Sequence, residues 1–506
     1  MLNGPFTMPM FRSLTPRKAQ PWIYLLFAFL FQLSGGMYAG AMPHTMGDTC
    51  MMREDVLMIV LCGVVGVNMP FPFLFRFKFR FTNRTLLTAA AAGIAVCNLL
   101  CLTTESVPLL CAISYVAGFL KLCGTFECMS NIQLWMTPKR DFAIFFPLLY
   151  CVVLGNMSLS PWLTVHLTYV FQSWHAMHLC MAAAMALVAL AVTVLTRDFR
   201  FMKPLPLVSL DWLGCLLWSA LMIEVIFLFN YGEYYNWLDG QPVRMVAWTV
   251  PVTLYFCVQR MRHIRHPYIA FEAWRYKGVA SLLGLFAVVE LISATDKALQ
   301  SPFTAALLHW GALQTAPLYL VEWTGTVAGC MFVMFWIKTL RQKYTRLLAL
   351  GMASLLAYEV MMYLSVSPGI DIAALFAPTF MRTFGVGIFF TALTIYLEDV
   401  MPFRHFFMGL TMMGIVRNGV VETVCSGIYG HLLRHHTADN LVRSLPYDTP
   451  QAMLLGVKQL FGATCIIAVA ALAVLLLWDL QPVRTTLRRM PSWAAVGRRL
   501  RMNLKR

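Results

Sequence analysis

Six ionisable side chains lie near the middle of long apolar stretches of this 506-residue chain. They are Lys121, Glu224, Glu290, Glu359, Arg382 and Arg417. A charged group in the hydrocarbon core of a membrane costs at least about 2.5 to 3.5 kcal/mol, so each one needs a partner or a task. Two kinds of chemistry are open to these residues: proton transfer by a carboxylate, and ion pairing between carboxylates and cations.

Glu290 is the leading candidate for a proton carrier. At about 1.5 Å per residue it lies roughly 18 Å into the apolar stretch 278–298, and a carboxylate at that depth can hold a proton near neutral pH. The alternative is a fixed ion pair with Lys121 or Arg382 that holds two halves of a bundle closed. Glu127 and Glu322 are second choices for the carrier, because each is expected nearer a membrane face, where a carboxylate is usually solvated.

The other charges are expected to have mainly structural tasks. Asp296 and Lys297 come close to the outer end of their stretch, where long side chains reach the interface or, alternatively, form a gate. Arg417 is expected to bind backbone carbonyls or acidic neighbours. For Glu224 and Glu359, packing or partner contacts are expected rather than transport.

The elements that position these residues are fourteen predicted membrane spans. They cover residues 22–44, 55–75, 85–103, 107–136, 143–165, 174–195, 211–231, 244–259, 278–298, 314–337, 347–367, 372–397, 405–430 and 454–479. Each is about as long as a hydrocarbon core requires, which is roughly 20 residues per helix. A content of 59% hydrophobic and 12% charged residues is typical of such a chain. The sequence therefore predicts an all-α polytopic membrane protein.

The basic residues indicate the topology of these spans. The chain has 39 Lys and Arg and a formal charge of +16, and most of these residues lie in every second loop, as the positive-inside rule expects of cytoplasmic loops. Both termini are therefore predicted to be cytoplasmic, and the charge is not taken as a nucleic-acid surface. The first apolar run is too long for a cleaved signal and is expected to remain as an anchor.

The chain divides into four predicted parts. Residues 1–200 form a six-helix bundle, 201–265 an inserted helix pair, 266–480 a second six-helix bundle and 481–506 a basic cytoplasmic tail that could lie on anionic lipid. No segment outside the spans is large enough for a soluble domain. The cysteines are scattered mostly within spans, and the repeated HxxxH pattern that membrane-bound iron enzymes need on the cytoplasmic side is missing, so neither a cofactor nor a metal is predicted. The histidines near the external loops, among them His178, are expected at the surface.

Four segments resemble the major facilitator superfamily, specifically its fourteen-span drug:proton antiporter branch. They are LSGGMYAGAMPHTMGD at 33–48, LDWLGCLLWSALMIEVIFLFNYGEYYNWLDG at 210–240, HPYIAFEAWRYK at 266–277 and MGLTMMGIVRNGVVETVCSGIYG at 408–430. The matching positions include Pro43, Asp48, Arg275 and Arg417. Ser34 departs from the family, which has an Asp in the first span. Ser114 stands near the place of a family Arg.

The resemblance implies a bacterial inner-membrane exporter rather than an enzyme. Such proteins move hydrophobic or cationic compounds against protons by alternating access, and some of them work with a periplasmic adaptor and an outer-membrane channel. It also implies that Lys121, Glu290 and Arg382 lie on spans that line a central cavity. Ser34 favours an alternative, a facilitator of a specific metabolite, lipid-like molecule or siderophore. A membrane-embedded enzyme or sensor would need a metal cluster or a soluble domain.

Overall fold

The computed structural model describes residues 10–477 except 14, 138–140, 201–202, 205, 208–209, 277, 341–343 and 444–448. The predicted tail at 481–506 lies outside these residues. Regular structure in the described ranges is helical, apart from one isolated bridge between Phe11 and Thr196. The fold is therefore an all-α bundle, as predicted.

The N-terminal half and the inserted pair contain these helices: α1 (Gln20–Leu33), η1 (Ala39–Ala41), α2 (Met42–Thr49), α3 (Arg53–Asn68), η2 (Phe71–Phe73), α4 (Leu74–Arg80), α5 (Asn83–Cys101), α6 (Val107–Met136), α7 (Phe142–Phe171), α8 (Trp174–Leu195), α9 (Trp212–Tyr231), η3 (Trp237–Asp239) and α10 (Gln241–His263).

The rest of the described chain forms these helices: η4 (Phe271–Arg275), α11 (Val279–Ser293), η5 (Asp296–Gln300), η6 (Phe303–Leu307), α12 (Ala312–Phe335), η7 (Trp336–Leu340), α13 (Tyr344–Ser365), η8 (Ile372–Leu375), α14 (Phe376–Val400), α15 (Phe403–Ile415), η9 (Val416–Val420), α16 (Val421–Arg443) and α17 (Thr449–Leu477). The segments η5, η6, η7 and η9 are π-helical.

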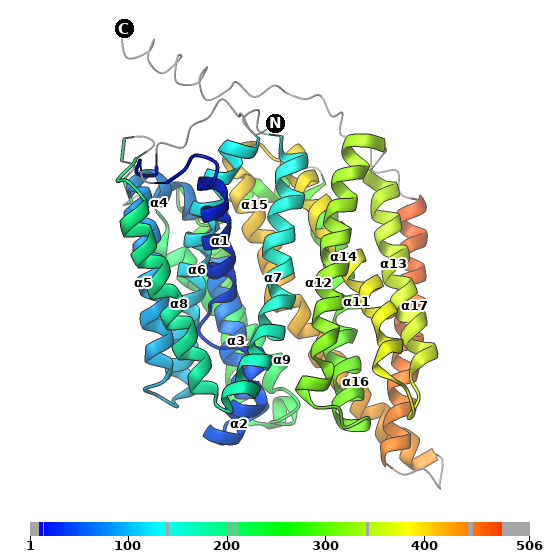
Figure 1. Ribbon diagram of the computed structural model, residues 1–506. Helices are drawn as coiled ribbons and strands as arrows, with labels where there is room; N and C mark the ends of the chain where they lie inside the picture. The colour runs from blue at the N-terminus through cyan, green and yellow to red at the C-terminus, as the bar shows by residue number, and fades with distance from the viewer. Residues whose placement is uncertain are drawn as a thin grey trace.

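The two halves are built alike. In the first, α6 packs against α1, α3 and α5, and α5 packs against α8; in the second, α14 packs against α11, α12 and α13, and α13 packs against α17. Figure 1 shows the first half on the left and the second on the right. Repeated helix bundles of this kind are typical of secondary transporters.

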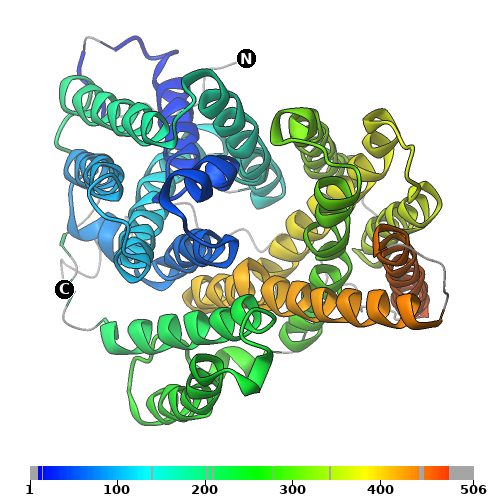
Figure 2. The ribbon, with the colours of Figure 1, turned by 90° about the horizontal axis from the view of Figure 1, so that it is seen from below.

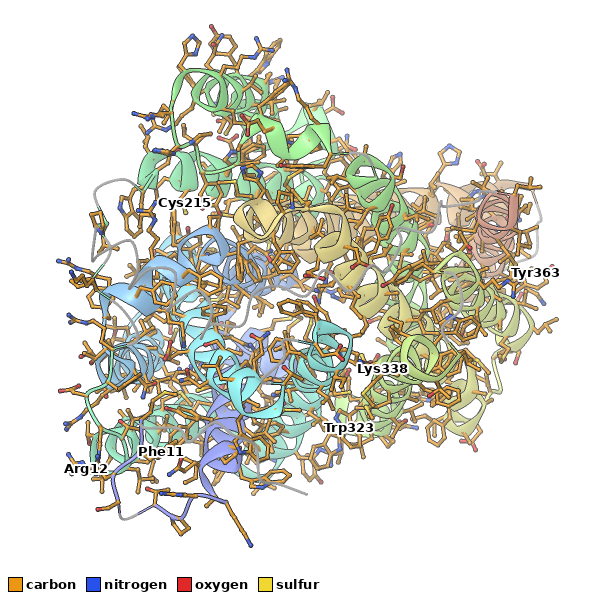
Figure 3. All side chains as sticks on the ribbon, turned by 90° about the horizontal axis from the view of Figure 1, so that it is seen from above. Phe11, Arg12, Cys215, Trp323, Lys338 and Tyr363 are labelled. Carbon is orange, nitrogen blue, oxygen red and sulfur yellow. The ribbon has the colours of Figure 1, made fainter. Side chains whose placement is uncertain are left out.

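The halves meet along two seams, and the inserted pair lies at one edge of the bundle. One seam is formed by α7 and α12, the other by α3 with α15 and η9. The helix α9 packs on α10 and contacts both α3 and α16, so the pair lies outside the two bundles (Figure 2). Figure 3 labels Trp323 and Lys338 on α12 and η7; Lys338 pairs with Asp141, directly before α7.

Close helix contacts in the first half depend on glycine. A Cβ built on Gly118 of α6 would lie 2.1 Å from the carbonyl oxygen of Gly63 on α3. No side chain fits at such a distance, so glycine allows these two backbones to approach.

The ends of helices are fixed by side chains such as Thr82, whose hydroxyl accepts from the amide of Thr85, and Asp211, which accepts from the amide of Gly214.

The structure confirms many apolar helices and corrects several predicted bounds. Among the described residues, eleven helices are long and apolar enough to cross a membrane, and two shorter ones, including α1, are also apolar. The predicted eighth span, α10, is in neither group, and the count of fourteen and the cytoplasmic termini stay predictions. The span predicted at 22–44 stops at Leu33, where Gly35 and Gly36 follow. Helices α4 and α16 continue to Arg80 and Arg443, into segments predicted as loops.

Candidate functional site

A cavity of about 710 Å³ lies between the halves, mostly against the first. We call it the central cavity. Its walls come from α1, α3, η2, α4, α6 and α7 of the first half and from α15 and η9 of the second. It extends from Phe142 and Phe406, at the starts of α7 and α15, to Ser34 and Pro161. This volume matches a small-molecule site.

The wall of the central cavity is mainly aromatic. Nine phenylalanines contribute to it: Phe71, Phe75, Phe79, Phe126, Phe142, Phe145, Phe146, Phe406 and Phe407. Several stack edge to face across the seam, such as Phe75 and Phe407, whose ring centroids are 4.6 Å apart. Aromatic and methionine side chains of this kind accommodate bulky apolar bodies.

The charged part of the wall is positive. Lys78, Lys121 and Arg417 line the cavity, and its described lining contains no Asp, Glu or His. The uncharged polar lining includes Gln32, Asn156 and other amide, hydroxyl and phenol groups. The sign of the wall is therefore set by three cations, which differ in how they are compensated.

Lys78 is compensated by a buried ion pair. Its ammonium lies 3.1 Å from a carboxylate oxygen of Glu127 and donates to Ser130 Oγ at 2.7 Å and Asn131 Oδ1 at 2.8 Å. The side chains of Lys78 and Glu127 are 6% and 1% exposed. Glu127 was predicted near a solvated membrane face; α4 and α6 instead bring it against a cation. Its contact with Lys78 was not predicted, because 76–84 was expected to be a loop.

Lys121 and Arg417 have no such ion pair. Within the described residues, Lys121 makes no hydrogen bond or ion pair. The guanidinium carbon of Arg417 lies 3.5 Å from the ring centroid of Phe390, a cation–π contact, and Arg417 makes no hydrogen bond or ion pair there either. Arg417 lies on the π-helical η9, and such segments often occur at functional sites.

Glu290 is buried in α11, 8% exposed, and does not line the central cavity. Among the described residues, the predicted alternative, a fixed ion pair of Glu290 with Lys121 or Arg382, is not present. Without a direct ion pair, Glu290 interacts electrostatically with Glu422, Arg417, Lys297 and Arg382.

Arg382 forms the centre of a three-residue ion cluster in the second half. Its guanidinium lies 2.7 Å from Glu322 and 3.1 Å from Asp296. Glu322 was predicted nearer a solvated face; α12 and α14 hold it against Arg382, with its side chain 17% exposed. Of the three charges that were predicted to line the central cavity, Lys121 is part of the described wall, whereas Arg382 and Glu290 are not.

Lys297 pairs with Glu422 at 2.5 Å, and Asp296 pairs with Arg382. The side chain of Lys297 is 64% exposed and that of Asp296 is 20% exposed, and both contact neighbouring helices. The residues Glu290, Asp296, Lys297, Glu322, Arg382, Arg417 and Glu422 form what we call the C-terminal charge cluster. Arg417 is the member of this cluster that also lines the central cavity.

Glu359 and Glu224 make packing contacts, as expected. The carboxylate of Glu359 is fully buried and accepts from the hydroxyls of Thr295 at 2.8 Å and Thr464 at 2.5 Å. Glu224 on α9 accepts from Thr253 on α10 at 3.0 Å and so connects the inserted pair.

Other polar residues differ from their predicted places. His178, expected at the surface, is buried and bonds through Nδ1 to Asn98 Oδ1 at 3.2 Å. Ser34 lines the cavity and Ser114 is buried beside Gly36, and neither hydroxyl has a hydrogen-bond partner. The positions that carry Asp and Arg in the resembled family are thus neutral and buried here.

Comparison with known proteins identifies the fold. No protein-family model matches the sequence, and no curated protein matches it. A solved structure of the nucleoside transporter NupG, crystallised as a point mutant, aligns with a TM-score of 0.54 and 9% identity over 90% of this chain and 99% of that chain. A bacterial homologue of the human lysosomal transporter Spinster, inward-facing and unoccupied, aligns with a TM-score of 0.52 and 12% identity over 94% of this chain and 99% of that chain.

The chain has the major facilitator fold. Together with its apolar helices, this fold describes an integral multi-pass membrane protein. Large apolar side chains are exposed around the perimeter of both halves, for example Leu187 at 67% and Ile466 at 73%, which suits a lipid-facing surface. The resemblance to the drug:proton antiporter branch stays a prediction.

Proposed function

We propose that the chain is a secondary transporter that moves a small, largely hydrophobic molecule through the central cavity by alternating access. The observation that carries this proposal is a cavity of about 710 Å³ whose wall comes from both halves of a repeated bundle. Substrate sites of such transporters lie where the repeats meet. Rocking of the halves along the two seams would expose the site to one side of the membrane and then the other.

The described conformation has its cavity toward the side where α1 begins. The walls reach Phe142 and Phe406 at that side, and at the other end η1 packs closely on α7. A Cβ on Gly40 of η1 would lie 2.0 Å from Thr164 Oγ1, so the two segments touch. If the termini are cytoplasmic, as predicted, this is an inward-facing state. Export, the predicted direction, would start from it.

Proton coupling through Glu290 is part of the same proposal. The C-terminal charge cluster contains four carboxylates, Glu290, Asp296, Glu322 and Glu422, and three cations, Lys297, Arg382 and Arg417. One bound proton would balance these charges, and Glu290 is the carboxylate without an ion pair. Because Arg417 also lines the cavity, substrate binding there would change the charge that Glu290 experiences. This supplies a physical link between substrate and proton.

The test is uptake and release of fluorescent hydrophobic compounds by efflux-deficient bacteria that express the chain. We expect lower accumulation than in control cells, and we expect the difference to disappear with a proton uncoupler and in Glu290→Gln. The matched control is Glu224→Gln, which changes a carboxylate on the inserted pair and should leave accumulation low. Unchanged accumulation in every strain, with membrane insertion confirmed, would exclude export of these compounds.

A second candidate is a transporter for a specific metabolite without proton coupling. Ser34 and the absence of a carboxylate from the described cavity lining favour it, because no acidic group there could exchange protons directly with a substrate. Saturable transport of one compound in proteoliposomes, equal with and without a pH gradient, would support this candidate. The periplasmic adaptor, the outer-membrane channel and the bacterial inner membrane stay predictions from the resemblance.

A further inference from the structure

We propose that the substrate is an amphipathic organic anion whose acidic group binds between Lys121 and Arg417, while its apolar body packs on the phenylalanines of the central cavity. This inference rests on the proposed function, since it takes the central cavity as the transport site. It keeps the predicted hydrophobic body of the substrate, but it replaces the predicted cationic group by a carboxylate, sulfonate or phosphate group.

The charge of the cavity wall carries the argument. Lys78 is neutralised by Glu127, whereas neither Lys121 nor Arg417 has a carboxylate within ion-pair distance among the described residues. Glu290 and Glu422 act on Arg417 only at longer range. A cation held in an apolar environment without a counter-charge is costly, so such groups are normally paired or bind a ligand. A bound anion would supply the missing counter-charge at Lys121 and a direct partner for Arg417. A permanent cation would add a further positive charge to the same wall.

The placement of the two cations adds a second reason. Lys121 lies on α6 of the first half, and Arg417 lies on η9 of the second. An anion that contacts both would hold the halves together at the cavity, and its release would free them. Arg417 is available for this task, because its present contact is the face of Phe390 rather than a carboxylate or carbonyl.

The rest of the wall fits the apolar part of such a molecule. Nine phenylalanines line the cavity, and about 710 Å³ is enough for a ring system of drug size. The amides of Gln32 and Asn156 can bind neutral polar groups on the body, and the Oδ1 of Asn156 has no partner at present. The predicted ligand therefore has one acidic head and an aromatic or acyl body.

The experiment compares two probes with the same apolar skeleton. One is the anion 1-anilinonaphthalene-8-sulfonate, and the other is the neutral N-phenyl-1-naphthylamine. Binding to the full chain in phosphatidylcholine nanodiscs is measured by fluorescence, with empty nanodiscs subtracted. The variants are Lys121→Gln, Arg417→Gln and Arg417→Lys. The control is Lys458→Gln, which removes a cation that contacts Tyr363 on the far side of the second half.

We expect Lys121→Gln and Arg417→Gln each to weaken binding of the anion by about ten- to hundredfold, as for hydrogen bonds to a charged group. Binding of the neutral probe should change by less than about threefold, which also shows that the cavity is folded. Arg417→Lys should retain most of the binding of the anion, and Lys458→Gln all of it. Equal loss of both probes, or no loss of the anion in either Gln variant, would overturn the proposal.

Two further arms separate the possible sources of the result. In one arm, anionic phosphatidylglycerol is added to the nanodiscs. It would compete with the sulfonate probe if the site binds a lipid head group, and it would leave binding of the probe unaffected if the site binds a soluble substrate. Flux of both probes in proteoliposomes tests the transporter proposal independently. Charge-dependent binding without flux would refute transport and keep the anion site. Flux of the neutral probe alone would keep transport and refute the anion site.

Discussion

The buried ion pair between Lys78 and Glu127 gives the sharpest test of the first half. In Glu127→Gln the shape of the side chain is kept, but the ammonium of Lys78 loses its counter-charge. Both side chains are more than nine-tenths buried, so water cannot replace the lost interaction. The hydrogen bonds from Lys78 to Ser130 and Asn131 remain possible, because these partners lie at 2.7 and 2.8 Å and are not altered.

Removal of one partner from a buried pair costs about 3 to 5 kcal/mol. The lower end of this range is expected, because the hydrogen bonds of the ammonium to Ser130 and Asn131 are kept. For a unit of about 200 residues, 1 kcal/mol shifts the Tm by roughly 2 to 4 °C. Glu127→Gln should therefore lower the unfolding temperature of the first half by roughly 6 to 12 °C.

Thermal unfolding in detergent can be followed with a thiol-reactive fluorescent dye. All fourteen cysteines are free and most are buried, including Cys123 and Cys128 on the same helix as Glu127, so the dye reports their exposure. The control is Glu105→Gln, which removes an exposed carboxylate and should change the Tm by less than about 2 °C.

The double variant Lys78→Gln with Glu127→Gln completes the test. The double variant leaves no unpaired charge. Its loss in unfolding temperature should therefore be smaller than the sum of the losses in Lys78→Gln and Glu127→Gln. The reasoning is refuted if Glu127→Gln unfolds within about 2 °C of the unaltered chain, or if the effects of the two single changes simply add.

Three other predictions follow from the contacts of the bundle. Gly118→Val should prevent stable folding, because even its Cβ would meet the carbonyl of Gly63 at 2.1 Å. The readout is loss of monodisperse protein in detergent, and the control is Gly284→Ala, where the added Cβ enters open space. Arg382→Gln should abolish transport, because two partly buried carboxylates, Asp296 and Glu322, lose their cation. Arg382→Lys should keep part of the transport; equal flux of the two variants would contradict the cluster. Glu359→Leu should lower the free energy of unfolding by about 1 to 3 kcal/mol, since two buried threonine hydroxyls lose the carboxylate as acceptor. Glu359→Gln should lower it less, and both are measured with the same dye assay.

Much of the fold could be predicted from the sequence, because the relevant signals are local. Apolar runs of about 20 residues show where the chain prefers lipid to water, and most of these runs coincide with helices in the structure. The errors concern segments whose state depends on neighbours. The charged segment at Leu74–Arg80 is helical because Phe73, Phe77 and Lys78 pack into the bundle, a fact that its composition did not reveal.

The candidate site could be predicted only in part. Lys121 and Arg417 were singled out as charges within apolar stretches, and the structure brings both to one cavity. Lys78 and Phe390 were missed, because a basic loop and one more phenylalanine carry no distinctive signal. Glu422 was also missed, although it lies inside the stretch 405–430 that was predicted as a span. A fixed pair for Glu290 was proposed from charge alone, and no such pair is present.

The sequence by itself determined the class of molecule: an apolar helical chain with a few charges that membranes rarely tolerate. It could do so because hydropathy acts along the chain, residue by residue. Only the tertiary structure decided which charges are neutralised, Lys78 by Glu127 and Arg382 by Asp296 and Glu322, and which face the central cavity. The physical reason is that an ion pair requires two side chains within about 4 Å, and helices far apart in sequence reach that distance only through their packing.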